Sequence, residues 1–204
     1  MKLVRYGEKG AEKPGLIDKS GQLRDLSAHV KDLTGEAYSP ESLKKLAGLD
    51  PASLPAVSGK PRFGAPVTGI SKFVAIGLNY SDHAKETGAD IPSEPIIFMK
   101  ANTSLSGPND AVEKPRGSTK LDWEVEIAAI IGTRAKYVSE ADALNHVAGY
   151  CVCNDVSERA FQTERQGQWT KGKSHDTFGP LGPWLATKDE IKDVQNLPMW
   201  LDVN

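Results

Sequence analysis

The sequence has few cysteines and no long apolar run, and each shortage excludes a class of protein. Its 204 residues contain only Cys151 and Cys153, separated by one residue, so they cannot build a disulfide framework. No apolar run approaches the roughly 18 residues of a membrane-spanning helix, and the start of the chain lacks the apolar centre of a signal peptide. We therefore expect a protein of the reducing cytoplasm, without a membrane partner.

An excess of charge of one sign is also missing. Lys and Arg number 25 against 27 Asp and Glu, so the formal net charge is −2 and no basic field is present to hold a nucleic acid. The motifs G-x-G-x-x-G, G-x-x-x-x-G-K-[ST], C-x-x-C and H-E-x-x-H do not occur, which argues against a nucleotide fingerprint and against the usual zinc sites. Hydrophobic residues make up 39% of the chain before its 19 glycines are counted, an ordinary value for a globular domain.

Turn signals and apolar segments divide the chain into two parts. Residues 1–70 predict a small N-terminal α/β unit, with a strand at Lys2–Tyr6 and a helix that begins at Ser39-Pro40-Glu41. Residues 71–204 contain short strands, the first at Phe73–Gly77, between short helices, without the regular alternation of a doubly wound fold. The pattern favours the α+β class, with the larger domain rich in β-structure.

The most informative segment is Leu121–Ile131, which gives the strongest strand prediction in the chain. Side chains alternate along a strand, so Asp122, Glu124 and Glu126 share one face. The simplest interpretation is an acidic face in water. Against it, the same face continues with Ala128, which places the acids at the rim of a core.

A third acid completes a possible metal site. Glu124 and Glu126 would lie about 7 Å apart on one face, where like charges repel unless a cation joins them. Asp155 follows a predicted strand at Gly149–Val152; alone, it would be interpreted as a turn residue or a helix cap. Three carboxylates form an oxygen-only site, which suits Mg²⁺, Mn²⁺ or Ca²⁺ better than Zn²⁺.

Four separate segments together resemble the fumarylacetoacetate hydrolase family. Its acylpyruvate hydrolase branch is closest in pattern, and its sugar-acid branch, which cleaves 2,4-diketo-3-deoxy sugar acids, stays open. The resemblance runs from about Phe73 to Asn204 and implies a β-rich mixed α/β roll that is usually a homodimer. It also implies that Glu124, Glu126 and Asp155 are ligands of a divalent metal, generally Mg²⁺ or Mn²⁺. The segments that carry it are Gly77–Glu86, Leu121–Glu126, Gly149–Arg159 and Lys173–Pro180.

The resemblance also assigns a pair of residues to water activation. His83 and Glu86 are spaced i, i+3 on a predicted helix, a spacing that by itself is more often a surface pair. In the family's hydrolases, a His and a Glu at these positions form the dyad that removes a proton from water.

Four further residues acquire roles near the metal. Arg159 and Gln162, also spaced i, i+3, would hold the substrate, although an exposed helix face is the alternative. Lys173 matches the lysine that would neutralise developing enolate charge. Lys100 matches a supporting position of the substrate site.

The implied reaction is hydrolytic carbon–carbon cleavage of an acylpyruvate or related 2,4-dioxo acid, a small-molecule keto acid, to pyruvate and a carboxylic acid. The metal would act as a Lewis acid on the keto acid, and His83 would activate water. Ureidoglycolate lyase and oxaloacetate decarboxylase use the same kind of metal site and stay open as alternatives. A non-catalytic keto-acid binding protein, which would bind oxalate and turn nothing over, is the alternative from another class.

The last residues predict an incomplete domain. Met199–Asn204 alternate like a strand with nothing after them to pair with. Members of the family usually continue past this point into more strands. We therefore expect residues 71–204 to be most, but not all, of a catalytic domain.

Overall fold

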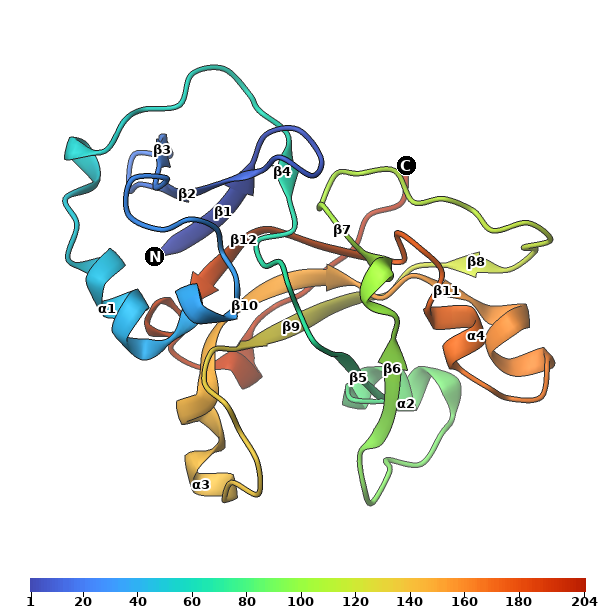
Figure 1. Cartoon of the computed structure of the whole chain (residues 1–204). Helices are drawn as coiled ribbons and strands as arrows, with labels where there is room; N and C mark the ends of the chain where they lie inside the picture. Colours follow the sequence, from blue (N-terminus) through green and yellow to red (C-terminus); the bar gives the residue numbers. More distant parts are fainter.

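One eight-stranded sheet runs through most of the chain and contains both its first strand and its last. The computed structural model describes residues 1–204 (Figure 1). The strand order is β3-β2-β1-β12-β10-β9, with β4 paired to β1 and β7 paired to β12. These strands are β1 (Lys2–Tyr6), β2 (Lys13–Ile17), β3 (Leu23–Asp25), β4 (Phe63–Gly64), β7 (Leu105–Ser106), β9 (Val125–Ile131), β10 (Val147–Asn154) and β12 (Gly179–Thr187).

The remaining elements are short. Two separate strand pairs are β5 (Phe73–Gly77) with β6 (Ile96–Lys100), and β8 (Leu121–Asp122) with β11 (Ser157–Glu158). The α-helices are α1 (Pro40–Ala47), α2 (Ser81–Thr87), α3 (Glu140–Ala143) and α4 (Thr170–Lys173), and residues Ala160–Glu164 form a π-helical turn, η5. Single 3₁₀ turns lie at Gly35–Tyr38, Pro51–Ser53, Asn102–Ser104, Leu144–His146, Lys188–Glu190 and Val194–Asn196. This sheet-rich arrangement confirms the predicted α+β class. None of the helices has the length and apolar character that a bilayer crossing needs.

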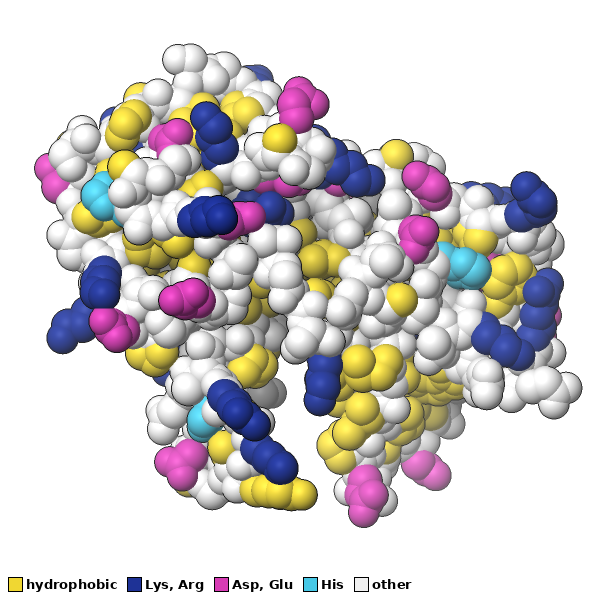
Figure 2. Space-filling view, in the orientation of Figure 1, with side chains coloured by type: hydrophobic (Ala, Val, Ile, Leu, Met, Phe, Trp, Pro, Cys, Tyr) yellow, Lys and Arg dark blue, Asp and Glu magenta, His cyan; other side chains and the backbone are white.

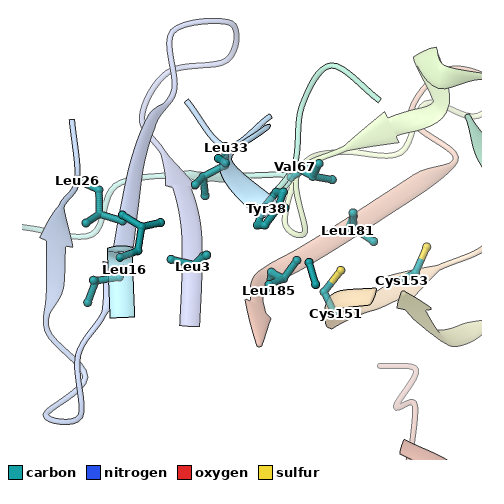
Figure 3. Close-up of a cluster of buried hydrophobic side chains, with 14 of the residues drawn as sticks. Leu3, Leu16, Leu26, Leu33, Tyr38, Val67, Cys151, Cys153, Leu181 and Leu185 are labelled. Atoms are coloured by element: carbon teal, nitrogen blue, oxygen red, sulfur yellow. The ribbon is translucent and has the colours of Figure 1, made fainter. Parts of the chain in front are cut away.

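The N-terminal strand is built into the same sheet and core as the last strand, β12. Strand β1 pairs antiparallel with β12, with Leu3 opposite Leu185. Both side chains are fully buried in the cluster of Figure 3, together with Cys151 and Cys153. Burial raises the pKa of both thiols, that of Cys153 to about 12, so each packs as a neutral apolar group. The boundary near residue 70 stays a prediction, because the two parts share this core.

The predicted strand Leu121–Ile131 is wrong as a single element, because the chain changes pairing partner within it. Strand β8 pairs with β11 and β9 pairs with β10, so Trp123 and Glu124 belong to neither ladder. The backbone of Glu124 is satisfied locally: its N–H donates to Asn154 Oδ1 at 3.1 Å, and its carbonyl accepts from Asp155 N at 3.0 Å. The break lies at the acids that the sequence singled out.

The strand-like run predicted at Met199–Asn204 has no pairing partner in the structure. Residues 197–204 follow the last 3₁₀ turn and belong to no sheet. Alternation of apolar and polar side chains is set by the local sequence, whereas a strand also needs a partner backbone to accept and donate its hydrogen bonds.

The space-filling view shows apolar side chains over the β5–β6 pair (Figure 2). Val74 pairs with Met99 across the two strands, and Ile97 lies on the same face. These side chains are 49%, 40% and 65% exposed. A two-stranded pair with this much apolar exposure presents an uncovered face.

A network of ion pairs fastens the β1–β2 hairpin to the loop after β7. Arg62 donates through Nε and Nη2 to both oxygens of Asp110, each at 2.6 Å, and through Nη1 to Glu12 Oε1 at 2.9 Å. Arg5, 8% exposed, donates to Asp32 at 2.7 and 3.0 Å and reaches the other oxygen of Glu12 at 3.4 Å. Glu12 therefore connects two arginines, and through them two distant loops.

We expect Arg62→Met to destabilise the fold by about 2 kcal/mol, because two carboxylates lose charged donors at a partly buried site. Arg62 holds the pKa of Asp110 below its ordinary value. The stabilisation is therefore fully present above about pH 4 and is lost as the pH falls through the lowered pKa. Thermal unfolding of wild type and variant at pH 7 and pH 3 measures both effects. Lys45→Met is the control, because its pair with Glu41 is exposed, and no measurable shift in Tm is expected. An Arg62→Met variant as stable as Lys45→Met at pH 7 contradicts the role given to the network.

Candidate active site

A cavity of about 1130 Å³ lies where helix α2, the start of β9 and the segment 194–201 meet. His83 and Glu86 line it from α2, and Glu124 and Glu126 line it from the region of the strand break. Arg159, which follows β11, also reaches its wall. Five of the nine residues predicted for the site therefore share one cavity.

Three acids form a carboxylate cluster at one side of this cavity: Glu124, Glu126 and Asp155. One oxygen of each lies within 4.8 Å of the others. The register of β9 and β10 explains the approach, because Asn154 pairs with Val125 and the next residue, Asp155, therefore arrives beside Glu124. Hard oxygen ligands at this spacing fit a divalent cation that bonds at about 2.0–2.6 Å. The cluster can therefore hold a metal ion.

Two lysines approach the cluster from behind the cavity wall. Lys173 Nζ, at the end of α4, lies 2.8 Å from Glu124 Oε2 and 2.8 Å from Asp155 Oδ2. Lys100 Nζ, at the end of β6, donates to the other oxygen of Asp155. Burial lowers the pKa of Lys100, and the charge of Asp155 opposes this shift. Both lysines are at most 2% exposed and do not line the cavity, so their contact with a substrate stays a prediction.

Close packing delivers Lys173 to this position. Helix α4 lies so near the η5 turn that a Cβ on Gly172 would come within 2.4 Å of Glu158 O and 2.7 Å of Gln162 N. Only a residue without a side chain fits there. The site therefore requires the glycine before Lys173. The sequence shows that a glycine stands there, but only the packing explains why.

Glu126 differs from the other two acids of the cluster. Glu124 and Asp155 receive hydrogen bonds from cations on both their oxygens, whereas no cation pairs with Glu126. Burial, followed by the charges of Asp155 and Glu124, raises the pKa of Glu126 to about 7. Glu126 is therefore the acid of the cluster that faces the cavity without a cationic partner.

The guanidinium of Arg159 is held on several sides. Its Nε donates to Asp122 Oδ2 at 2.8 Å, its Nη2 lies 2.6 Å from Glu124 Oε1, and its Nη1 donates to Gln162 Oε1 at 3.1 Å. Sequence reasoning placed Asp122 on the acidic face of the strand but gave it no role in the site. Its position two residues before Glu124 was the available indication of a role in the site. Its contact with Arg159 could be recognised only from the tertiary structure.

The turn that carries Arg159 is fixed by a buried acid. Glu158 is 0% exposed and accepts backbone hydrogen bonds from Thr119, Lys120 and Phe161 at 2.7–2.9 Å. Burial alone would raise the pKa of Glu158, but these donors lower it below its ordinary value. Because Glu158 and Gln162 are both buried, the alternative of an exposed helix face is wrong here.

Helix α2 is tied to β9 by the residue that precedes it. Tyr80 Oη accepts a hydrogen bond from Ile127 N at 3.1 Å. His83 and Glu86 then project from α2 into the cavity wall, as the helical spacing predicted. No hydrogen bond joins the two side chains, so their action as a dyad stays a prediction.

Comparison with known proteins identifies the family. The family model for the fumarylacetoacetate hydrolase C-terminal region matches residues 72–204. The chain belongs to the fumarylacetoacetate hydrolase family. This confirms the resemblance found in the sequence, and it supports enzymatic activity of the hydrolase and isomerase kind that the family contains.

Relatives in this family have related names and folds. A protein of Burkholderia ambifaria, provisionally named a hydrolase, is 58% identical over all 204 residues, which span 72% of its length. The fumarylacetoacetate hydrolase of Exiguobacterium antarcticum is 31% identical, with a TM-score of 0.75 over 93% of this chain and 67% of that one. The 5-carboxymethyl-2-hydroxymuconate delta-isomerase of Mycobacterium smegmatis is 32% identical, with a TM-score of 0.65 over 92% and 66%.

Replacing Lys173 with Met should lower the free energy of unfolding by about 3–5 kcal/mol, since two largely buried carboxylates lose their shared cation. Chemical denaturation in the presence of a chelator measures this. Lys171→Met is the matched control, because Lys171 is exposed and bonds only to a backbone carbonyl. Equal stability of the two variants would show that Lys173 does not hold the cluster together.

The raised pKa of Glu126 predicts a pH-dependent affinity for divalent cations. Below about pH 7 Glu126 holds a proton that a cation must displace, so the affinity for Mn²⁺ should fall roughly tenfold per pH unit. Above that pH the affinity should level off. Calorimetric titration with Mn²⁺ between pH 5.5 and 8.5 measures the profile, and Glu126→Gln should flatten it. A wild-type profile without a break near neutral pH contradicts the prediction.

Proposed function

We propose that this chain forms a Mg²⁺-dependent hydrolase that cleaves a carbon–carbon bond in an acylpyruvate or related 2,4-dioxo acid. One observation carries the proposal: His83 and Glu86 line the same cavity as Glu124 and Glu126. A base for water and a cluster of metal-type ligands therefore face one space. Water adds at the 4-keto carbon, the bond between carbons 3 and 4 breaks, and carbon 3 takes a proton, which gives pyruvate and a carboxylic acid.

The cation would supply Lewis-acid stabilisation of negative charge on the keto-acid oxygens when it is bound by Glu124, Glu126 and Asp155. His83 removes the proton from water, and Glu86 orients its ring once the two side chains approach. Arg159 keeps one Nη1–H that no protein group occupies, since Asp122, Glu124 and Gln162 take the others. We assign that hydrogen to the substrate carboxylate.

The base facing the cavity favours hydrolysis over decarboxylation, because loss of CO₂ from oxaloacetate needs no activated water. Ureidoglycolate lysis and binding without turnover remain alternatives on the same metal site. Isomerisation is a second candidate, since a relative with 32% identity is named a delta-isomerase and a base such as His83 can move a proton between carbons. A homodimer belongs to this proposal as well, and the apolar face of β5–β6 supports it.

Two single substitutions separate the proposed roles. His83→Ala should reduce kcat on acetylpyruvate by at least about 100-fold while Mg²⁺ affinity stays within twofold, because the base is lost and the ligands remain. Glu126→Ala should weaken Mg²⁺ binding by at least about tenfold. A coupled assay of pyruvate release measures kcat, and calorimetry measures the Mg²⁺ affinity. Lys85→Ala, on the outer side of α2, is the control.

Several results would overturn the proposal. Full activity in excess chelator would remove the metal from the reaction. Full activity of His83→Ala would remove the proposed base. Tight binding of oxalate with no turnover of any dioxo acid would favour a binding protein, and double-bond migration without pyruvate release would favour an isomerase.

A further inference from the structure

The cavity has two chemically different walls. His83, Glu86, Glu124, Glu126 and Arg159 form a charged wall. The other wall comes from the segment after the last 3₁₀ turn, through Leu197, Met199 and Leu201, a set that we call the apolar wall.

Alternation along the segment selects these three side chains. Leu197, Met199 and Leu201 line the cavity and are 38%, 38% and 37% exposed. Trp200, between two of them, is 75% exposed and does not line the cavity. Successive side chains of an extended segment point to opposite sides, so one side faces the cavity and the other faces solvent.

Strand β9 adds two aliphatic side chains to the cavity lining. Val125 and Ile127 line the cavity and alternate with Glu124 and Glu126. A bound molecule would therefore meet carboxylates, an arginine and aliphatic side chains within one cavity. A cavity of about 1130 Å³ is larger than the head of a pyruvyl group needs.

We propose that the apolar wall is the subsite for an aliphatic or aromatic acyl group of the substrate. The inference rests on the proposed function and narrows its substrate class to acylpyruvates with an apolar acyl chain. A 2,4-diketo sugar acid would place hydroxyl groups against Leu197, Met199 and Leu201, where they would lose hydrogen bonds to water without replacement.

The physical basis is the removal of apolar surface from water on both sides of the contact. Each methylene buried against the wall should raise kcat/KM about fourfold until the wall is covered. The bond cleavage does not require the part of the acyl chain beyond the 4-keto carbon, so the effect of chain length and the chemistry can be measured separately.

The test is the slope of kcat/KM with chain length from acetylpyruvate to butanoylpyruvate and hexanoylpyruvate, measured on the full chain with Mg²⁺. Wild type should show a rise of about fourfold per methylene, and Met199→Ser and Leu201→Ser should reduce that slope. Trp200→Ser is the matched control, since its side chain points away from the cavity, and it should keep the wild-type slope. A 2,4-diketo-3-deoxy sugar acid should be a poorer substrate than hexanoylpyruvate by at least tenfold.

A flat series in wild type, a preference for the sugar acid, or an equal loss of slope in Trp200→Ser would overturn the inference. Failure of the proposed function looks different, because no acylpyruvate would then be cleaved at any length. In that case the dissociation constants of straight-chain 2-keto acids of four to eight carbons, measured by calorimetry with Mg²⁺, test the wall without turnover. Affinity that rises with length in wild type and less in Met199→Ser supports the wall, and affinity independent of length overturns it.

Discussion

The close approach of three carboxylates is the constraint on which the rest of this structure depends. Acids within 4.8 Å of one another repel, and burial increases the cost of their charges. The fold supplies opposite charge from three elements that are distant in the sequence: Lys100 ends β6, Lys173 ends α4 and Arg159 follows β11. The contacts that neutralise the acids therefore also fix these elements around the end of the β9–β10 pair.

The three acids do not receive equal numbers of cationic partners, and this difference decides which of them can take up a further cation. Asp155 and Glu124 each accept from a cation on both oxygens, whereas Glu126 has no cationic partner and faces the cavity. An incoming cation would therefore supply the partner that Glu126 lacks, beside two acids whose positions are held by hydrogen bonds. The same packing that buries Lys173 depends on Gly172, so the electrostatics of the site rest on a steric requirement.

Much of the site was predictable from local sequence patterns, although the local structure at these residues differs in part from the predicted one. Alternation placed Glu124 and Glu126 on one face of a strand, whereas the chain breaks its ladder between β8 and β9 beside Glu124. Helical spacing correctly brought His83 and Glu86 to one side of α2. Asp122 received no role, because the contact that gives it one, with Arg159, joins residues 37 positions apart.

By itself, the sequence determined which segments are extended or helical, which residue types are available as hard ligands, and the family to which the chain belongs. Strand β1 and helix α2 followed from residues that are neighbours along the chain. The tertiary structure alone decided that β1 pairs with β12, that Lys100 and Lys173 lie behind the cluster, and that the alternating end of the chain lines a cavity instead of joining a sheet. The physical reason is that local spacing sets where a side chain points, whereas hydrogen-bond partners and opposite charges come from segments far along the chain.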